Sequence, residues 1–235
     1  MKMTMTLADK LLPDQPLNNE YYGGSGYHRD LYDLIAESSG LVPPTEAFTL
    51  ALSDKFTIEE MASNPVQLRL LELFVRLLGA KSIIEIGAFI GLSAMTMARA
   101  MPAGGKLITI EKFDHFADIC RRNVAANGLA DRIEVMEGDA LDAIGRIPQD
   151  TRFDLAFIDG NKERYVDHFR LLEPYVRPGG LILVDDVFFH GDALNATPKT
   201  AKGEGVKTFM RMAAGLGDRF RAVLPVCNGL MVIQK

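Results

Sequence analysis

Acidic side chains stand at or near the ends of several apolar segments that are typical of buried strands. Glu85, Glu111 and Asp159 each close such a segment, and Asp185 and Asp186 follow another. In open parallel sheets the ligand crevice lies outside the carboxyl ends of the strands, so these acids are expected to converge on one rim. A single acid there is usually a helix cap. Several acids on one rim repel one another, which indicates that cations or hydroxyl donors bind among them.

The last three of these acids have the composition of a site for a hard cation. Asp159, Asp185 and Asp186 come from two strand ends that are expected to be neighbours, and no His or Cys accompanies them. Carboxylate oxygens alone suit Mg²⁺ or Ca²⁺. Among the histidines, only His190, in a loop shortly after Asp186, is a candidate for this rim.

A glycine turn follows the first of the strands, in the sequence Glu85-Ile86-Gly87-Ala88-Phe89-Ile90-Gly91-Leu92-Ser93. A strand that turns through glycine into a helix presents backbone N–H groups and the positive end of the helix dipole to a ligand. The turn lacks the third glycine of a dinucleotide fingerprint, so it suits an amino acid and a ribose better than a diphosphate. A plain strand-to-helix turn is the alternative interpretation.

Two further acids fit the same ligand. Glu111 ends the next predicted strand, where a carboxylate can accept hydrogen bonds from both ribose hydroxyls. Asp139, in Gly138-Asp139-Ala140, either borders an adenine or caps the short helix that follows, and both roles are open.

Alternating strands and helices must position these residues. Asn64 caps a helix that starts at Pro65 and closes at Gly79. Strands are predicted at 82–86, 106–110, 132–136, 153–158 and 181–184, and helices at 92–101, 114–127 and 162–172. Two last strands, 221–226 and 230–233, flank an Asn-Gly turn. This rhythm predicts a doubly wound, Rossmann-like α/β sheet, mostly parallel, that ends in an antiparallel hairpin.

The N-terminal residues are harder to interpret. We expect 1–60 to be a helical extension, with a short helix capped by Thr45 and running through Leu52, ahead of the domain formed by 61–235. The extension either walls a substrate pocket or forms a dimer contact. Residues 188–205 are either a lid or a mobile loop.

Composition restricts the function classes. A net charge of −5 argues against nucleic-acid binding. No apolar run approaches the ~20 residues of a membrane span, and no secretory signal is visible, so the cytoplasm is the expected location.

Together these motifs resemble the cation-dependent O-methyltransferases that include the catechol and caffeoyl-CoA enzymes. The resemblance rests on Glu85-x-Gly87-x-x-x-Gly91-x-Ser93, Glu111, Gly138-Asp139-Ala140, Asp159-x-x-Lys162 and Asp185-Asp186. It implies a seven-stranded sheet whose last strand is antiparallel, a small-molecule phenol or diol as acceptor and, as in many bacterial relatives, a homodimer.

The resemblance also assigns the site residues. Asp159, Asp185 and Asp186 would hold Mg²⁺ (or Ca²⁺ or Mn²⁺), Lys162 would be the base, and Asn161 stands where the catechol enzyme has a tryptophan wall. S-adenosylmethionine would contact the following residues: Ser63, Glu85, Gly87, Ala88, Phe89, Ser93, Glu111, Asp139, Ala140 and Asp159. The family usually has asparagine at the position of Asp186, so the extra charge is expected to tighten cation binding.

The chemistry requires a nearly anionic oxygen in line with the S–CH₃ bond. A phenol has a pKa of ~10, and a divalent cation bound by two neighbouring hydroxyls stabilises the anion and fixes its geometry. Lys162 can take the proton if it is neutral, and burial and a nearby cation are expected to lower its pKa from ~10.4. The alternatives are a nicotinamide-dependent oxidoreductase and an S-adenosylmethionine-binding protein without catalytic activity.

Overall fold

The structure is a computed structural model that describes residues 34–235. The chain divides into two units, 1–41 and 42–235. The described part of the first unit is helical at 34–38 and then turns at Gly40, which has a positive φ of 58°. Most of the predicted helical extension lies outside the described residues. Its role as a substrate wall or dimer contact stays a prediction.

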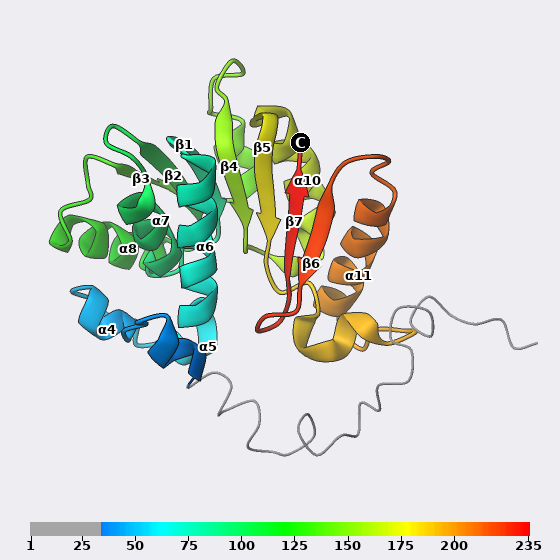
Figure 1. Cartoon of the computed structure of the whole chain (residues 1–235), viewed down its shortest axis with the longest axis horizontal. Helices are drawn as coiled ribbons and strands as arrows, with labels where there is room; N and C mark the ends of the chain where they lie inside the picture. The colour runs from blue at the N-terminus through cyan, green and yellow to red at the C-terminus, as the bar shows by residue number, and fades with distance from the viewer. Residues whose placement is uncertain (1–33) are drawn as a thin grey trace, which may run out of the picture. The chain divides into compact units, whose positions relative to one another are not determined.

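The second unit alternates strands and helices, as Figure 1 shows. Its helices are α4 (Pro44–Ala47), α5 (Ile58–Met61), α6 (Pro65–Leu78), α7 (Leu92–Ala100), α8 (Asp114–Ala126), α9 (Ala140–Ile144), α10 (Tyr165–Leu172) and α11 (Ala201–Ala214). Its strands are β1 (Ser82–Ile86), β2 (Lys106–Glu111), β3 (Ile133–Glu137), β4 (Phe153–Ile158), β5 (Val176–Val184), β6 (Arg221–Leu224) and β7 (Leu230–Gln234). Three 3₁₀ segments complete it: η1 (Lys162–Arg164), η2 (Glu173–Tyr175) and η3 (Phe189–Leu194).

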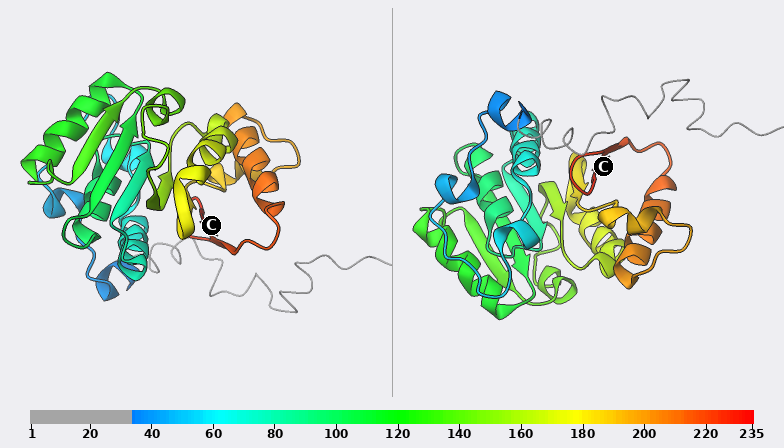
Figure 2. Two further views of the ribbon diagram at one scale, coloured as in Figure 1. Left: turned by 90° about the horizontal axis from the view of Figure 1, so that it is seen from above. Right: turned by 90° about the horizontal axis from the view of Figure 1, so that it is seen from below.

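The strands form one seven-stranded sheet in the order β3-β2-β1-β4-β5-β7-β6. Neighbours from β3 to β5 are parallel, and β7 is antiparallel to both β5 and β6. The predicted α/β fold with a closing antiparallel hairpin is therefore confirmed. The hairpin inserts its second strand, β7, next to β5, so the turn between β6 and β7 lies beside the residues that follow β5. Figures 1 and 2 show β3 and β6 at opposite ends of the sheet.

Helices cover both faces of the sheet, and alternate strand residues point to each face. One buried cluster joins α6, α7 and α8 to Ile83 of β1 and to the residues of the other strands that point to the same face of the sheet. The other cluster joins α9, α10 and α11 to Ile84 and to the strand residues that point to the opposite face. Because both faces are covered, the parallel strands are nearly continuous apolar runs, which is why the ends of β1 and β4 are predictable from the sequence.

The start and end of α6 follow from its capping residues. The Asn64 carboxamide oxygen accepts a hydrogen bond from the backbone N–H of Val66 at 2.9 Å, Pro65 is the first helical residue, and Gly79 ends the helix with a left-handed φ of 60°. Of these three features, only the Asn64 cap depends on a side-chain hydrogen bond. The other two use the fixed φ of proline and the freedom of glycine, and the predicted bounds are confirmed.

The predicted helix from Thr45 through Leu52 is wrong in both its cap and its length. The helix α4 starts after Pro43 and ends at Ala47. The backbone beyond it is extended because side chains of α8 compete for its hydrogen bonds. Asn127 bonds both backbone groups of Thr49, and Asn123 does the same for Ala51.

Three later predictions also need correction. The helix α11 was not predicted, and it occupies the end of the expected 188–205 loop. The strand β5 begins at Val176 instead of residue 181, and the extra residues Pro178-Gly179-Gly180 are absorbed as a register shift against β4. The strand β6 ends at Leu224 instead of residue 226.

Candidate active site

The carboxyl ends of the parallel strands are tied together one residue beyond each strand. The N–H groups of Gly138, Asp159 and Asp185 each donate to the last residue of the neighbouring strand, and that of Gly87 donates to the last residue but one of β2, all at 2.9 to 3.0 Å. The hydrogen-bond ladder therefore continues into the rim. As a result, the residues that leave the sheet have fixed backbone positions before any side-chain contact is counted.

The glycine turn needs a left-handed backbone at three places. Gly87, Phe89 and Gly91 have φ values of 102°, 47° and 92°. A Cβ on Gly87 would overlap the Asp159 carbonyl group, and one on Gly91 would lie 2.8 Å from the Cys120 sulfur. Neither glycine can therefore carry a side chain. Gly91 is the N-cap of α7, so the turn leads directly into a helix N-terminus, as the sequence predicts.

Glu85 lies below the rim and is completely buried. Its Oε2 accepts a hydrogen bond from the Thr109 hydroxyl at 2.5 Å, and the two residues are paired in the register of β1 and β2. Burial raises the pKa of Glu85 to about 7, although hydrogen bonds from Ser93 and Thr109 act in the other direction. Glu85 therefore joins the end of β1 to β2 through Thr109.

Glu111 is the carboxylate that the turn orients. Its Oε2 accepts the Phe89 N–H at 2.8 Å, and its Oε1 accepts the Phe113 N–H at 3.0 Å. Burial raises the pKa of Glu111, and these backbone donors oppose the shift. Each carboxylate oxygen has a second lone pair, so Glu111 still has acceptor capacity for a pair of hydroxyls.

Asp139 performs the capping role that the sequence left open. Its carboxylate accepts the Leu141 N–H at 3.1 Å as the N-cap of α9, and this bond lowers the pKa of Asp139. Lys112 forms an ion pair with it at 3.2 Å. Ala140, the first residue of α9, is buried. The adenine role of the pair stays a prediction.

The three aspartates meet as the topology predicts. Asp159, Asp185 and Asp186 each offer one oxygen, and these oxygens lie within 4.8 Å of one another. Burial raises the pKa of Asp159, with repulsion from Asp186 adding to it, while Lys162 acts against the shift. Burial, with repulsion from Asp159 and Asp186, also raises the pKa of Asp185 well above its usual range. The cluster is short of positive charge.

Lys162 lies inside this cluster. Its Nζ is 2.8 Å from Asp159 Oδ1 and 3.0 Å from Asp186 Oδ2. Burial favours the neutral amine, as predicted, but the neighbouring negative charges, Asp159 first among them, outweigh it and raise the pKa of Lys162 well above its usual range. The effect of the aspartates was not predicted and outweighs burial, and the lowering of this pKa by a nearby cation stays a prediction. A base at this position needs those charges to be compensated.

Two structural supports that the sequence analysis missed hold the cluster. The Tyr165 hydroxyl donates to the Asp185 carbonyl oxygen at 3.0 Å, and its fully buried ring lies under the Lys162 ammonium, 5.9 Å from its centroid. The turn between β6 and β7 holds the next residues, because the N–H groups of Val187 and Phe188 donate to Gly229 and Asn228. Tyr165 could have been found one helical turn after Lys162, whereas the contact from the hairpin depends on the strand order.

The remaining predicted residues lie at the margins. Ser63 is partly exposed and directly precedes the cap of α6. Asn161 is exposed and caps η1 by accepting the Glu163 N–H at 3.2 Å. His190 is exposed, has a positive φ of 52°, and its ring contacts Phe189. The structure does not bring Asn161 or His190 into contact with the aspartates.

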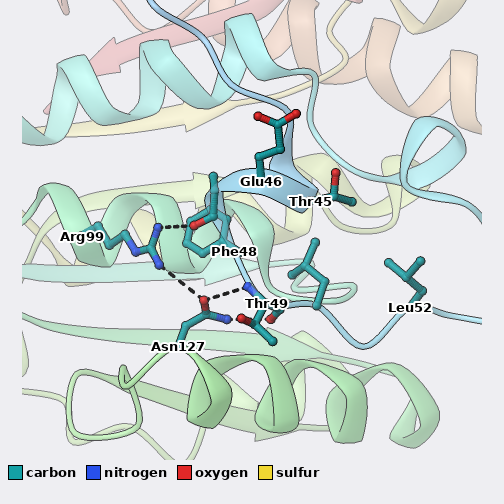
Figure 3. Close-up of a pocket in the computed structure, with 9 residues that line it drawn as sticks. Thr45, Glu46, Phe48, Thr49, Leu52, Arg99 and Asn127 are labelled. Atoms are coloured by element: carbon teal, nitrogen blue, oxygen red, sulfur yellow. Dashed lines mark hydrogen bonds between the residues drawn. The ribbon is translucent and has the colours of Figure 1, made fainter.

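A hollow of about 540 Å³ has a different set of lining residues, which Figure 3 draws. It lies between the segment 45–52 and the last turns of α7 and α8, where Arg99 stacks on the Phe48 ring at 3.9 Å. None of the residues that line it belongs to the cluster of acids. This hollow is therefore separate from the cluster of acids.

A parallel sheet closed by an inserted antiparallel strand, with an acid-lined rim, defines the class of protein. The family model described as O-methyltransferase matches residues 47–235, and the chain belongs to this family. A catechol O-methyltransferase from Niastella koreensis is 32% identical over 199 residues, covering 83% of this chain and 87% of the relative. A caffeoyl-CoA O-methyltransferase from Eucalyptus gunnii is 26% identical and covers 87% of both chains.

A solved structure agrees with these relatives. The O-methyltransferase TomG from Streptomyces achromogenes, solved in complex with S-adenosylmethionine, superposes with a TM-score of 0.78 at 27% identity, covering 90% of this chain and 99% of that one. The protein is thus an S-adenosylmethionine-dependent O-methyltransferase of the catechol and caffeoyl-CoA type. The oxidoreductase alternative is not favoured. Within residues 34–235, no helix has both the length and the apolar character needed to cross a bilayer.

Proposed function

We propose that this enzyme depends on a divalent metal ion and methylates one hydroxyl of a catechol-like vicinal diol. The observation that carries the proposal is the cluster of Asp159, Asp185 and Asp186 beside Lys162. The name of the Niastella relative, a catechol O-methyltransferase, points to the same class of acceptor.

The donor set fits a hard divalent cation. All three side chains are carboxylates, and burial with mutual repulsion raises the pKa values of Asp159 and Asp185. Oxygen ligands of this kind suit Mg²⁺, Ca²⁺ or Mn²⁺. When bound, such an ion supplies Lewis-acid stabilisation of a phenolate and orients two neighbouring hydroxyls.

Lys162 is assigned to receive the proton of the acceptor hydroxyl at Nζ. Its position is set by Asp159 and by the Tyr165 ring beneath it. Compensation of the carboxylate charge removes the interaction that keeps the ammonium protonated, and burial then favours the neutral amine. The same charges that hold the lysine in place therefore also control its basicity.

The cofactor is assigned to the other half of the rim. The turn 87–91 and Ser93 would contact the methionine part, Glu111 the ribose, and Asp139 with Ala140 the adenine. Support for this comes from the spare lone pairs of Glu111 and from the helix N-terminus that follows the turn. Ser63 and Glu85 remain predicted contacts of the methionine part, and Asn161 and His190 remain predicted substrate contacts. A homodimer is a further prediction, which size-exclusion chromatography with light scattering tests.

An assay over paired acceptors tests the proposal. Catechol, its meta isomer and a monophenol are incubated with S-adenosylmethionine in EDTA and after addition of Mg²⁺. We expect methylation of the vicinal diol alone and only with Mg²⁺. Undiminished methylation in EDTA would overturn the metal assignment. Equal turnover of the meta isomer would overturn the vicinal-diol assignment, while binding of S-adenosylhomocysteine separately tests the cofactor.

A further inference from the structure

Asn123 of α8 and Asn127, the C-cap of that helix, bind an extended stretch of chain, Thr49–Ala51. Asn127 accepts from the Thr49 N–H at 3.1 Å and donates to its carbonyl at 2.8 Å, as Figure 3 shows. Asn123 accepts from the Ala51 N–H at 2.6 Å and donates to its carbonyl at 3.1 Å. Alternate residues of an extended chain are ~6.6 Å apart, and side chains four apart on a helix are ~6 Å apart, so the two spacings match.

The two asparagines differ in their remaining contacts. The second donor hydrogen of Asn123 goes to the Ile90 carbonyl, in the glycine turn, at 2.9 Å. Asn127 instead donates its second amide hydrogen to the Asn123 backbone carbonyl at 2.8 Å, and its carboxamide oxygen accepts a hydrogen bond from the Arg99 guanidinium at 3.4 Å. Asn123 is 1% exposed, and both of its amide hydrogens have protein acceptors. Of this pair, Asn123 alone joins the bound stretch to the turn.

The turn needs such a contact because Phe89 has a left-handed φ of 47° without being glycine. The backbone hydrogen bond from the Gly91 N–H to the Ala88 carbonyl closes the turn at 2.8 Å, and three further contacts hold Phe89 there. Its N–H donates to Glu111 Oε2 at 2.8 Å, and its ring packs edge-on against Phe116 at 5.1 Å. Asn123 then fixes the carbonyl of the next residue, Ile90. Strained backbone persists only where its surroundings determine it in this way.

We infer that Asn123 is a positioning residue for the cofactor. By holding the Ile90 carbonyl it keeps Phe89 in the left-handed conformation, and Phe89 in turn keeps its N–H on Glu111. Glu111 is the carboxylate assigned to the ribose, so the inference rests on the proposed function. Loss of the Asn123 contact lets the Phe89 backbone relax, and Glu111 loses one of the two donors that orient it.

Asn123→Ala and Asn127→Ala form a matched pair. Each removes the hydrogen bonds of one asparagine to the stretch Thr49–Ala51, and only Asn123→Ala also removes the hydrogen bond to the turn. Calorimetry in EDTA measures binding of S-adenosylhomocysteine, and thermal melting measures stability. We expect both variants to have a lower melting temperature than wild type. Only Asn123→Ala should bind the cofactor product about tenfold more weakly, the size of one lost buried hydrogen bond, while Asn127→Ala stays within about twofold.

A ribose-modified ligand separates positioning from general loosening. Wild type should bind the 2′-deoxyribose analogue of S-adenosylhomocysteine more weakly than the parent, and Asn123→Ala should discriminate less between the two. Equal weakening by both alanine variants, unchanged binding in Asn123→Ala, or unchanged discrimination would overturn the inference. Wild type that ignores the ribose hydroxyl would instead overturn the assignment of Glu111. If Asn123→Ala does not fold, Asn123→Asp keeps the acceptor for Ala51 and removes the donor to Ile90.

Discussion

The two halves of the rim are held by different forces. In the β1–β3 half, which contains the turn 87–91 and Glu111, backbone N–H groups and hydroxyls bind buried carboxylates, and the backbone is strained at Phe89. In the β4–β5 half, carboxylates face one another around Lys162. The first half is a fixed cradle of hydrogen bonds. The second is a set of like charges whose balance would change with the proposed binding of a cation.

This difference separates affinity for the cofactor from reactivity. Changes in the β4–β5 half should act on turnover and metal binding, and changes in the β1–β3 half should act on stability and cofactor binding. The two halves meet where β1 and β4 end, because the Asp159 N–H donates to the Ile86 carbonyl at 2.9 Å and the Asp159 carbonyl packs against Gly87. Variants confined to one half therefore test whether the rim is really divided in this way.

The largest effect is expected from Lys162→Met. Removing the assigned base should lower kcat by about 10²- to 10⁴-fold, the usual contribution of a positioned proton acceptor. Binding of S-adenosylhomocysteine should stay within about twofold, because no contact joins Lys162 to the turn among the described residues. Arg164→Met, in the exposed remainder of η1, is the control. A kcat loss below tenfold would remove Lys162 from the mechanism.

In the other half, Glu85→Gln tests the buried carboxyl. Its pKa is raised from 4.5 to about 7, so between these values the folded state holds a proton that the unfolded state releases. Wild-type stability therefore falls as pH rises through this window. The loss should amount to about 3 kcal/mol relative to Glu85→Gln, which carries no titrating group.

Denaturant unfolding at pH 4.5, 5.5 and 7 measures this difference. The stability of the glutamine variant relative to wild type should increase across the series. Glu134→Gln, at an exposed position of β3, is the control. A pH-independent difference would show that Glu85 does not titrate between these values.

The sequence predicts the rim better than it predicts the supports behind it. The bounds of β1 and β4 follow from apolar runs covered on both faces, and the parallel topology alone brings Asp159 and Asp185 together. The raising of the Lys162 pKa by the aspartates could not be predicted, because it depends on a distance of about 3 Å to two carboxylates. No sequence pattern contains that distance.

The helix α11 was missed for a related reason. Gly203 and Gly205 lower helix propensity, so residues 201–205 resemble a loop. The structure explains both glycines by close packing. A Cβ on Gly203 would overlap the Asp192 carboxylate, and one on Gly205 would lie 2.6 Å from the Glu163 Cα. Tertiary contact overrides local preference at both positions.

Gly205→Ala uses this contact to disturb the β4–β5 half alone. The new methyl group must displace η1, which carries Lys162, at a cost of about 2 kcal/mol for overpacking. The melting temperature and kcat should both fall, while the affinity for the cofactor should be retained. Gly215→Ala, at the end of the same helix, meets its nearest neighbour only at 3.4 Å and should change little. Equal effects of the two substitutions would contradict this account of the packing.

The smallest effect is expected from Asp186→Asn, which changes the charge of the β4–β5 half and little else. Asp186 has a left-handed φ of 54°, which asparagine tolerates equally well, so the backbone should not move. The variant loses one full charge from the cluster and the ion pair with Lys162 at 3.0 Å. Mg²⁺ affinity measured by calorimetry should fall by about tenfold, because affinity for hard cations rises with the number of charged ligands.

The control is Asp167→Asn, which removes an exposed charge paired with Arg164 and should leave the affinity for Mg²⁺ unchanged. Equal or tighter Mg²⁺ binding by Asp186→Asn would show that the third carboxylate serves the lysine and not the ion.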